Sequence, residues 1–111
     1  MPTCKEIFEA MPQGFDAEEA GDWESVIQYN IEGDGGGTWT MTVAGGACTV
    51  VEGPSDAATA TVDSDVETWV GIGDGSVEPT SAFMMGKIRI QGNMADVLKA
   101  QKVIKKDKIS G

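Results

Sequence analysis

The chain has 111 residues, of which 41% are hydrophobic and 23% are charged, and its formal net charge is −10. This length fits one domain spanning residues 1–111, and the composition is ordinary for a globular protein. No apolar run approaches the roughly 18 residues that a membrane span needs, so stable membrane insertion is not expected.

The charge is divided unevenly along the chain. Residues up to Gly86 include 16 acidic residues and one basic residue, whereas the segment from Lys87 onward has seven basic and two acidic residues. Nucleic-acid binding is not expected, because neutralising phosphates requires many Lys and Arg side chains. For the basic segment, which ends in the tail 105–111, a solvated helix face and a transient contact with a membrane both stay open.

The N-terminus and the cysteines indicate the compartment. No basic segment followed by a long apolar stretch opens the chain, so no secretory signal is indicated. Two cysteines without such a signal, Cys4 and Cys48, favour reduced and buried thiols in the cytoplasm.

The first predicted element is a short amphipathic helix. Thr3 and Glu6 have capping-box spacing at its start, and residues 12–14 end it. A further turn of helix is expected at 17–21. The apolar residues of the first helix recur on one face: Cys4, Ile7, Phe8 and Met11.

From residue 24 to residue 62 the pattern changes to strict alternation, which is typical of strands with one polar face. The glycine-rich segments 33–37 and 45–46 are expected to be hairpin turns. We therefore expect an α+β fold, with a mainly antiparallel sheet that is solvated on one face and covered by helices on the other. Its five strands are expected near 27–31, 38–43, 48–50, 58–62 and 87–91.

Three further helices are expected to cover the sheet. The first begins at 63–67, where Ser64 and Glu67 have capping-box spacing, and the second begins at Pro79 and ends at Gly86. The third begins near Asn93. It has one apolar stripe interrupted by a polar residue: Met94, Val97, Leu98, Gln101 and Ile104.

The residue types that most catalytic sites need are missing. The sequence has no His, which excludes Ser-His pairs, Cys-His pairs and His metal ligands. The glycine-rich segment 71–75 lacks a Gly-Lys-Ser/Thr ending, and Thr68 occupies the position where a calcium loop starting at Asp63 needs glycine. We expect no catalytic residue, metal or cofactor. An enzyme that uses carboxylates alone would require a buried pair with a raised pKa.

The apolar residues allow two interpretations. The six Met and three Trp residues fit ordinary core packing, but Met is also overused at adaptable apolar binding sites. Phe83, Met84 and Met85 follow one another on one predicted helix and cannot all face the same core. At least one of them should point toward solvent, a partner or a cavity.

The stretch from Ser81 to Met94 resembles the signature segment of the sterol carrier protein 2 family. In that family a Ser-Ala-Phe-like helix runs into a Gly-Lys-apolar-x-apolar-x-Gly-Asn/Asp-Met segment. The order of elements is similar over nearly the whole chain, and 98–101 resembles the last helix of the family. The resemblance implies five strands, with helices on one side that enclose an apolar tunnel for sterols, fatty acids, fatty acyl-CoA or other long apolar molecules. It also implies a carrier rather than an enzyme.

The resemblance implies a set of tunnel residues, in which Gln101 is the polar group that orients a headgroup or hydroxyl. The tunnel residues carried over from the family are Phe83, Met84, Met94, Leu98 and Gln101. The apolar pattern adds Ile7, Met11, Met41 and Trp69.

The chain ends in residues 109–111, Ile-Ser-Gly, rather than in a Ser-Lys-Leu-like peroxisomal signal. A stand-alone bacterial or archaeal cytoplasmic protein is therefore expected. One alternative function stays open: a partner or oligomerisation domain, including a weak homodimer, that presents acyl substrates to a separate lipid-metabolising enzyme.

Overall fold

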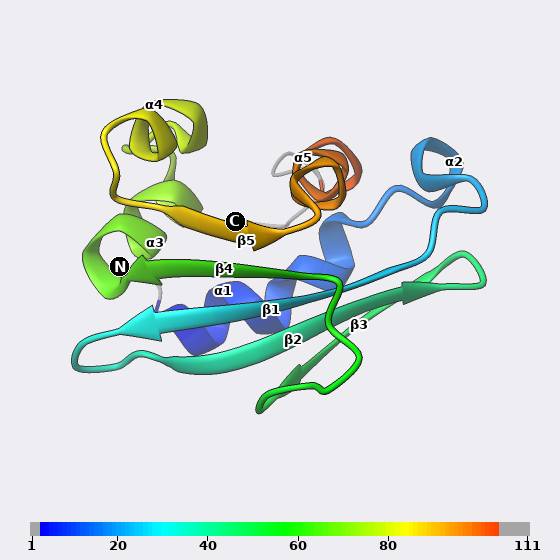
Figure 1. Ribbon diagram of the computed structural model, residues 1–111, viewed down its shortest axis with the longest axis horizontal. Coiled ribbons are helices and arrows are strands. Elements are labelled where there is room, and N and C mark those ends of the chain that lie inside the picture. Colours follow the sequence, from blue (N-terminus) through cyan, green and yellow to red (C-terminus); the bar gives the residue numbers. More distant parts are fainter. Residues whose placement is uncertain (1–2, 105–111) are drawn as a thin grey trace.

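The computed structural model describes residues 3–104, and the predicted basic tail 105–111 lies outside them. Five strands form one sheet in the spatial order β3-β2-β1-β4-β5 (Figure 1). Neighbouring strands are antiparallel except for the parallel pair β1 and β4, so the predicted five-stranded, mainly antiparallel sheet is confirmed. The strands are β1 Ser25–Glu32, β2 Gly37–Ala44, β3 Ala47–Glu52, β4 Ala60–Asp65 and β5 Arg89–Gly92.

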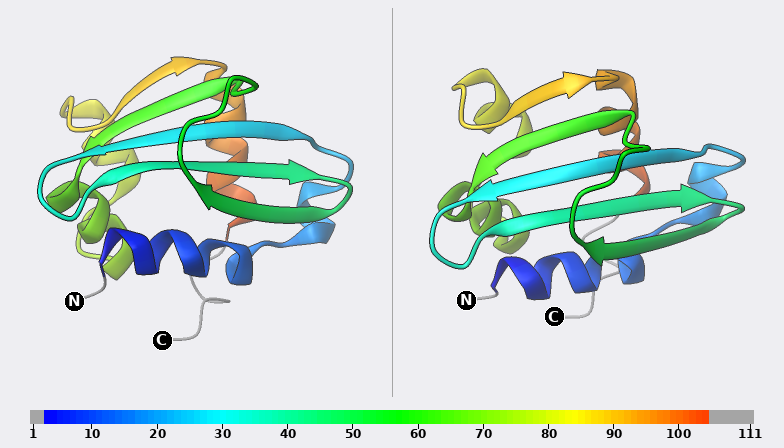
Figure 2. Two further views of the ribbon diagram at one scale, coloured as in Figure 1. Left: turned by 90° about the horizontal axis from the view of Figure 1, so that it is seen from below. Right: turned by 60° about the horizontal axis from the view of Figure 1, so that its bottom comes forward.

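Helices α1, α3 and α5 lie against one face of the sheet, as predicted, whereas α4, which was also expected to cover the sheet, lies at its edge beside the start of β5 (Figure 2). The capping box of Thr3 and Glu6 is present at the start of α1, and Asn93 caps α5 by accepting the backbone N–H of Asp96. No helix within residues 3–104 has the length and apolar character needed to cross a membrane. The helices are α1 Cys4–Ala10, the 3-10 helix η1 Met11–Gly14, α2 Ala17–Ala20, α3 Val66–Asp74, α4 Pro79–Met84 and α5 Met94–Val103.

The start of α3 differs from the predicted capping box. Strand β4 continues to Asp65, whose carboxylate accepts the backbone N–H of Thr68 at 2.7 Å and caps the helix. Ser64 is buried as the next inward residue of β4 after Ala60 and Val62. The prediction of Ser64 as the cap is wrong because Ser64 still belongs to the strand.

The orientation of α5 also differs from the prediction. Val97, Ala100 and Val103 are buried against the rest of the protein. Met94, Leu98 and Gln101, which have the spacing i, i+4, i+7, lie on an exposed stripe of the same helix. The predicted stripe mixed these two faces, because periodicity does not show which side of a helix meets the sheet.

An aromatic stack fills the core between the sheet and its helices. The Phe8 ring of α1 stacks on Trp39 of β2, with centroids 4.5 Å apart, and on Trp69 of α3, with centroids 5.1 Å apart. Tyr29 of β1 packs against both Phe8 and Trp69 in tilted contacts. Aromatic pairs at these distances stabilise a core beyond the burial of their area.

The opposite face of the sheet is polar, and the connection from β3 to β4 crosses it (Figure 1). Gln28 Oε1 accepts the backbone N–H of Ser55 at 3.1 Å, and Thr40 Oγ1 donates to the carbonyl of Gly53 at 2.7 Å. Thr40 is therefore buried although it belongs to the polar set. The crossing segment covers part of a face that the sequence pattern predicts to be solvated.

Candidate functional site

The predicted ligand residues separate into two groups. Ile7 is half-buried, and Met11, Met41 and Trp69 are buried members of the core under the sheet. These four side chains pack against other protein side chains, as ordinary core residues do. The prediction that they line a tunnel is not tested by this arrangement.

The second group lies on α4 and α5. Six large hydrophobic residues are exposed within residues 3–104, and five of them belong to the short stretch 83–98. They are Phe83 (39% exposed), Met84 (80%), Met85 (70%), Met94 (42%) and Leu98 (52%), the sixth being Val51 (60%) of β3. Scattered exposed apolar residues need no explanation, but their concentration on the two helices that β5 joins makes this part of the protein a candidate binding surface.

Strand β5, at the edge of the sheet, joins the two helices. Figure 1 and both views in Figure 2 place α4 at the start of β5 and the beginning of α5 at its end. Ala82 of α4 is buried, and Gly92 turns the chain into α5 with φ +85°. A side chain at Gly92 would bring its Cβ to 2.5 Å from the carbonyl oxygen of Thr59, so only glycine fits there without a shift.

Asp96 fixes α5 to the segments that immediately precede β1 and β4. Its carboxylate accepts Trp23 Nε1–H at 3.2 Å and Thr59 Oγ1–H at 2.7 Å. Partial burial disfavours the charged form, but the hydrogen bonds from Thr59, Trp23 and Ser25 together hold the pKa of Asp96 below its usual value. This anchoring turns Met94, Leu98 and Gln101 outward.

Gln101 occupies the end of the exposed stripe on α5, one turn beyond Leu98. Its predicted role as the polar group of the site is compatible with this place. Trp69 is a second candidate for contact with a polar ligand atom, because its Nε1 is the one buried side-chain nitrogen or oxygen of residues 3–104 without a hydrogen-bond partner.

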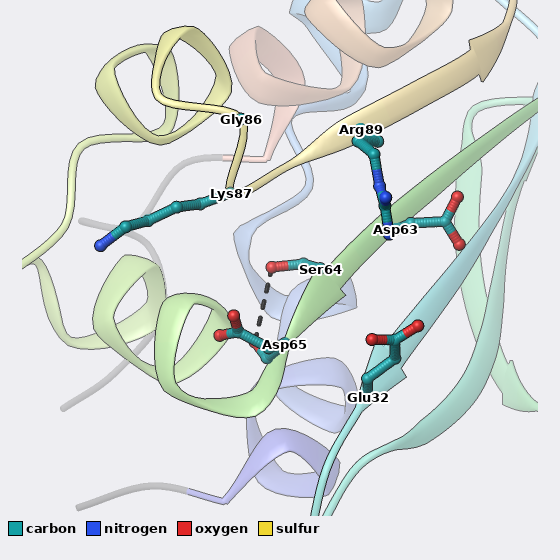
Figure 3. A pocket seen from close by; sticks show the side chains of 7 residues that line it. All are labelled: Glu32, Asp63, Ser64, Asp65, Gly86, Lys87 and Arg89. Carbon is teal, nitrogen blue, oxygen red and sulfur yellow. Dashed lines mark hydrogen bonds between the residues drawn. The ribbon is translucent and has the colours of Figure 1, made fainter.

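A separate polar pocket of about 270 Å³ lies where the parallel strands β1 and β4 end (Figure 3). The hydrogen bond from the backbone N–H of Thr68 lowers the pKa of Asp65. The lowered pKa values of Asp65 and Asp96 both favour the ionised carboxylate, whereas a general acid needs a protonated carboxyl group. The pocket is lined by Glu32, Asp63, Ser64, Asp65, Gly86, Lys87 and Arg89.

Within residues 3–104, no group of three or more His, Cys, Asp or Glu side chains is arranged to hold a metal ion. The two cysteines are free thiols there. Burial raises the pKa of the Cys48 thiol to about 11 and also raises the pKa of Cys4. Protonated thiols of this kind are poor nucleophiles.

Met85, Lys87 and Arg89 were not among the predicted site residues. All three are exposed, and Arg89 lies opposite Asp63 in the pairing of β4 with β5. The sequence does contain a pattern that could have pointed to them, namely the consecutive apolar residues 83–85 followed by two basic residues. Their exposure depends on the orientation of α4, which the sequence does not reveal.

The fold and the exposed apolar edge define a class of protein: a one-sided α+β domain in which helices cover one face of a five-stranded sheet. The model of the SCP-2 sterol transfer family matches residues 5–105. The chain therefore belongs to the SCP-2 sterol transfer family.

Similar proteins include longer ones. Hydroxysteroid dehydrogenase-like protein 2 from Rattus norvegicus is 32% identical over 103 residues, which are 92% of this chain and 20% of that protein. The chain thus spans about a fifth of the length of the curated relatives it matches.

Two solved structures show the same fold. One is the palmitated SCP2L2 from Aedes aegypti, with a TM-score of 0.79 and 22% identity, covering 93% of this chain and 95% of that one. The other is the sec-alkylsulfatase Pisa1 from Pseudomonas sp., with a TM-score of 0.80 and 17% identity, covering 94% of this chain and 16% of that one.

Proposed function

We propose that this chain is a non-enzymatic lipid-binding and lipid-transfer domain whose ligand is a sterol, a fatty acid, a fatty acyl-CoA or a similar long apolar molecule. The observation that carries the proposal is the concentration of exposed apolar side chains on α4 and α5. Membership of the SCP-2 sterol transfer family supports it. The palmitated relative supports a fatty acid as the first ligand to test.

The proposed contacts follow from the exposure of each side chain. Phe83, Met94 and Leu98 are partly exposed and contact the apolar tail, with Met84 at the rim. Gln101 meets the polar end of the ligand. Each methylene group removed from water contributes roughly 0.8 kcal/mol, so a chain of about a dozen carbons needs no special chemistry to bind. The predicted core residues Ile7, Met11, Met41 and Trp69 would join the site where a tail reaches between the helices and the sheet.

The first experiment identifies the ligand. Purified protein is extracted with organic solvent and the extract is examined by mass spectrometry, and then the delipidated protein is titrated with fatty acids of increasing chain length. A stoichiometric lipid and an affinity that rises with chain length are expected. Binding that does not depend on chain length would contradict an apolar site.

Leu98→Asp tests the position of the site. A carboxylate in an apolar contact must be desolvated, so palmitate affinity is expected to fall about tenfold or more. Val51→Asp is the matched control, because Val51 is similarly exposed but lies on β3, and it should bind palmitate as the wild type does. Equal affinities of the two variants would place the ligand away from α5.

A second candidate function is that of a partner domain presenting acyl substrates to a lipid-metabolising enzyme. The observation in its favour is that similar folds form about a fifth of hydroxysteroid dehydrogenase-like protein 2 and 16% of the sulfatase chain. Pull-down and gel filtration test it. A free monomer with no enzyme bound would contradict both this function and the predicted weak homodimer.

The cytoplasmic location and the prokaryotic origin of the chain stay predictions.

A further inference from the structure

One hydrogen-bond donor in the core of this protein has no acceptor. Within residues 3–104, Nε1 of Trp69 is the one buried side-chain nitrogen or oxygen atom without a partner, and the Trp69 side chain is 9% exposed. The indole N–H of Trp23, by contrast, donates to the Asp96 carboxylate at 3.2 Å. A buried N–H that lacks an acceptor destabilises a folded protein, and most buried polar groups therefore have a partner. The unpaired N–H of Trp69 points to an acceptor that a bound molecule supplies.

The packing around Trp69 keeps this N–H inside the core. The indole ring stacks on Phe8 with centroids 5.1 Å apart and an angle of 12° between the ring planes, and it meets Tyr29 in a tilted contact at 5.2 Å. One turn further along α3, a Cβ at Gly73 would lie 2.6 Å from Cδ1 of Ile7, so α1 and α3 approach each other closely here. A ring packed in this way is not free to turn its N–H toward solvent.

The surroundings of Trp69 favour a neutral acceptor over a charged one. The side chains of its core cluster are aliphatic, aromatic or sulfur-containing, and no basic residue within residues 3–104 is buried. Burial raises the pKa of Tyr29, so this core favours the neutral phenol over its anion. A carboxylate or phosphate brought to Trp69 would lose its hydration without gaining a counter-charge.

The second polar contact proposed for the ligand lies in a different environment. Gln101 is exposed on α5, where an ionised head group keeps its contact with water. Trp69 is buried under the sheet on α3. The two positions therefore suit different chemical groups of one ligand, an ionised or strongly polar end at the surface and a neutral oxygen in the core.

We propose that the ligand of this domain carries a neutral oxygen, as in a ketone, ester or hydroxyl group, on the part that enters the core, and that Trp69 Nε1–H donates a hydrogen bond to it. The inference rests on the proposed function, because it names the class of long apolar ligand that the same site selects. Trp69 is then a specificity-determining residue. A plain hydrocarbon tail leaves its N–H unpaired, whereas an oxygen at the right depth along the tail pairs with it.

Matched fatty acids test the proposal on the delipidated full chain. Stearate is compared with a series of oxostearates, which keep the same carboxylate and carry one ketone at successive positions along the chain. In a purely apolar site a ketone without a partner weakens binding at every position, by about tenfold. Here one position is expected to bind at least about threefold more tightly than stearate, the size of one neutral hydrogen bond. A series in which every oxostearate binds more weakly than stearate would overturn the proposal.

Two variants assign the preference to one indole N–H. Trp69→Phe keeps an aromatic ring in the stack but removes the donor, and the ketone should then weaken binding at every position. Trp39→Phe is the matched control, because Trp39 is also buried and stacked on Phe8 but its Nε1 is not a buried atom without a partner. This control should keep the preference. A preference that survives in Trp69→Phe, or that both variants lose equally, would overturn the assignment.

Heteronuclear NMR of the wild type tests the hydrogen bond without any variant. The indole N–H signal of Trp69 is expected to lie further downfield in the complex with the preferred oxostearate than in the complex with stearate. The signal of Trp23, which already donates to Asp96, should be the same in both complexes and serves as the reference. Identical Trp69 signals in the two complexes would overturn the proposal.

The same titrations separate this inference from the proposed function. Stearate binding without any preference for a ketone would overturn the role of Trp69 and leave the proposed lipid-binding function standing. Absence of binding by stearate and by every oxostearate would overturn both. Tight binding of one oxostearate together with weak binding of stearate would support both.

Discussion

Phe8 is the residue on which the aromatic core depends most directly. Its side chain is fully buried and touches aromatic rings from two strands and from α3. Phe83 is also a phenylalanine, but its side chain is 39% exposed on α4. The same substitution at the two positions therefore compares a buried ring with a surface ring.

Phe8→Ala is expected to lower the free energy of unfolding by about 3–5 kcal/mol, because it removes a buried ring and leaves a cavity. Phe83→Ala, the same change at the surface, should cost about 1 kcal/mol or less. Urea denaturation followed by tryptophan fluorescence measures both values. Equal losses would contradict the division between core and site.

Helix α5 owes its position to partners that lie far from it in the sequence. The Asp96 carboxylate accepts hydrogen bonds from Trp23 and Thr59, and Lys99 Nζ donates to the carbonyl of Glu19 at 3.3 Å. Beyond the helix, Ile104 pairs with Phe15 in an isolated bridge. These contacts select the face of α5 that is buried, and thereby leave Leu98 exposed.

Asp96→Ala is expected to cost about 1–2 kcal/mol of stability at neutral pH through loss of the hydrogen bonds to a charged group. A pKa that folding lowers stabilises the protein above the unfolded value of 3.8, and this stabilisation is lost as the pH falls through the folded pKa. The difference between variant and wild type should therefore shrink below about pH 4. Chemical denaturation at a series of pH values measures it.

Asp56→Ala removes an exposed carboxylate from the crossing segment and serves as the control. It should change stability by less than about 0.5 kcal/mol. If the loss of unfolding free energy in Asp96→Ala is the same at neutral and acidic pH, the charge of the Asp96 carboxylate does not contribute to stability.

The molecule as a whole has far more repulsion than attraction among its charges. It has 18 acidic and eight basic residues, and within residues 3–104 one ion pair is present, Lys5–Glu9, with N and O 4.0 Å apart at the surface. The radius of gyration is 12.7 Å. At about 0.01 M salt the screening length is about 30 Å, so like charges repel one another across the whole protein. At about 0.15 M salt the screening length is about 8 Å, and this repulsion is weaker.

Raising NaCl from about 0.01 M to about 0.15 M is expected to increase the free energy of unfolding at neutral pH, by on the order of 1 kcal/mol. Urea denaturation at both salt concentrations measures the change. Near pH 4.2, the isoelectric point expected from the sequence, the net charge should vanish and with it the effect of salt. A protein that salt destabilises at neutral pH would have attractive ion pairs that outweigh its net charge.

Most of the local structure could be predicted from the sequence because its causes are local. The capping box at Thr3, the N-cap at Asn93, the proline at the start of α4 and the alternation in β1 and β2 each depend on residues a few positions apart. The resemblance of Ser81 to Met94 led to the right family for the same reason, since it is carried by one continuous segment.

The remaining features depend on residues that are distant in the sequence, and only the tertiary structure decided them. The parallel pairing of β1 and β4 requires the chain to pass through β2, β3 and the crossing segment first. Ser64 remained in the strand because its side chain faces the core, which no capping pattern reveals. The two faces of α5 were separated by Asp96 and its partners, because periodicity gives the spacing of a stripe but not the direction in which it points.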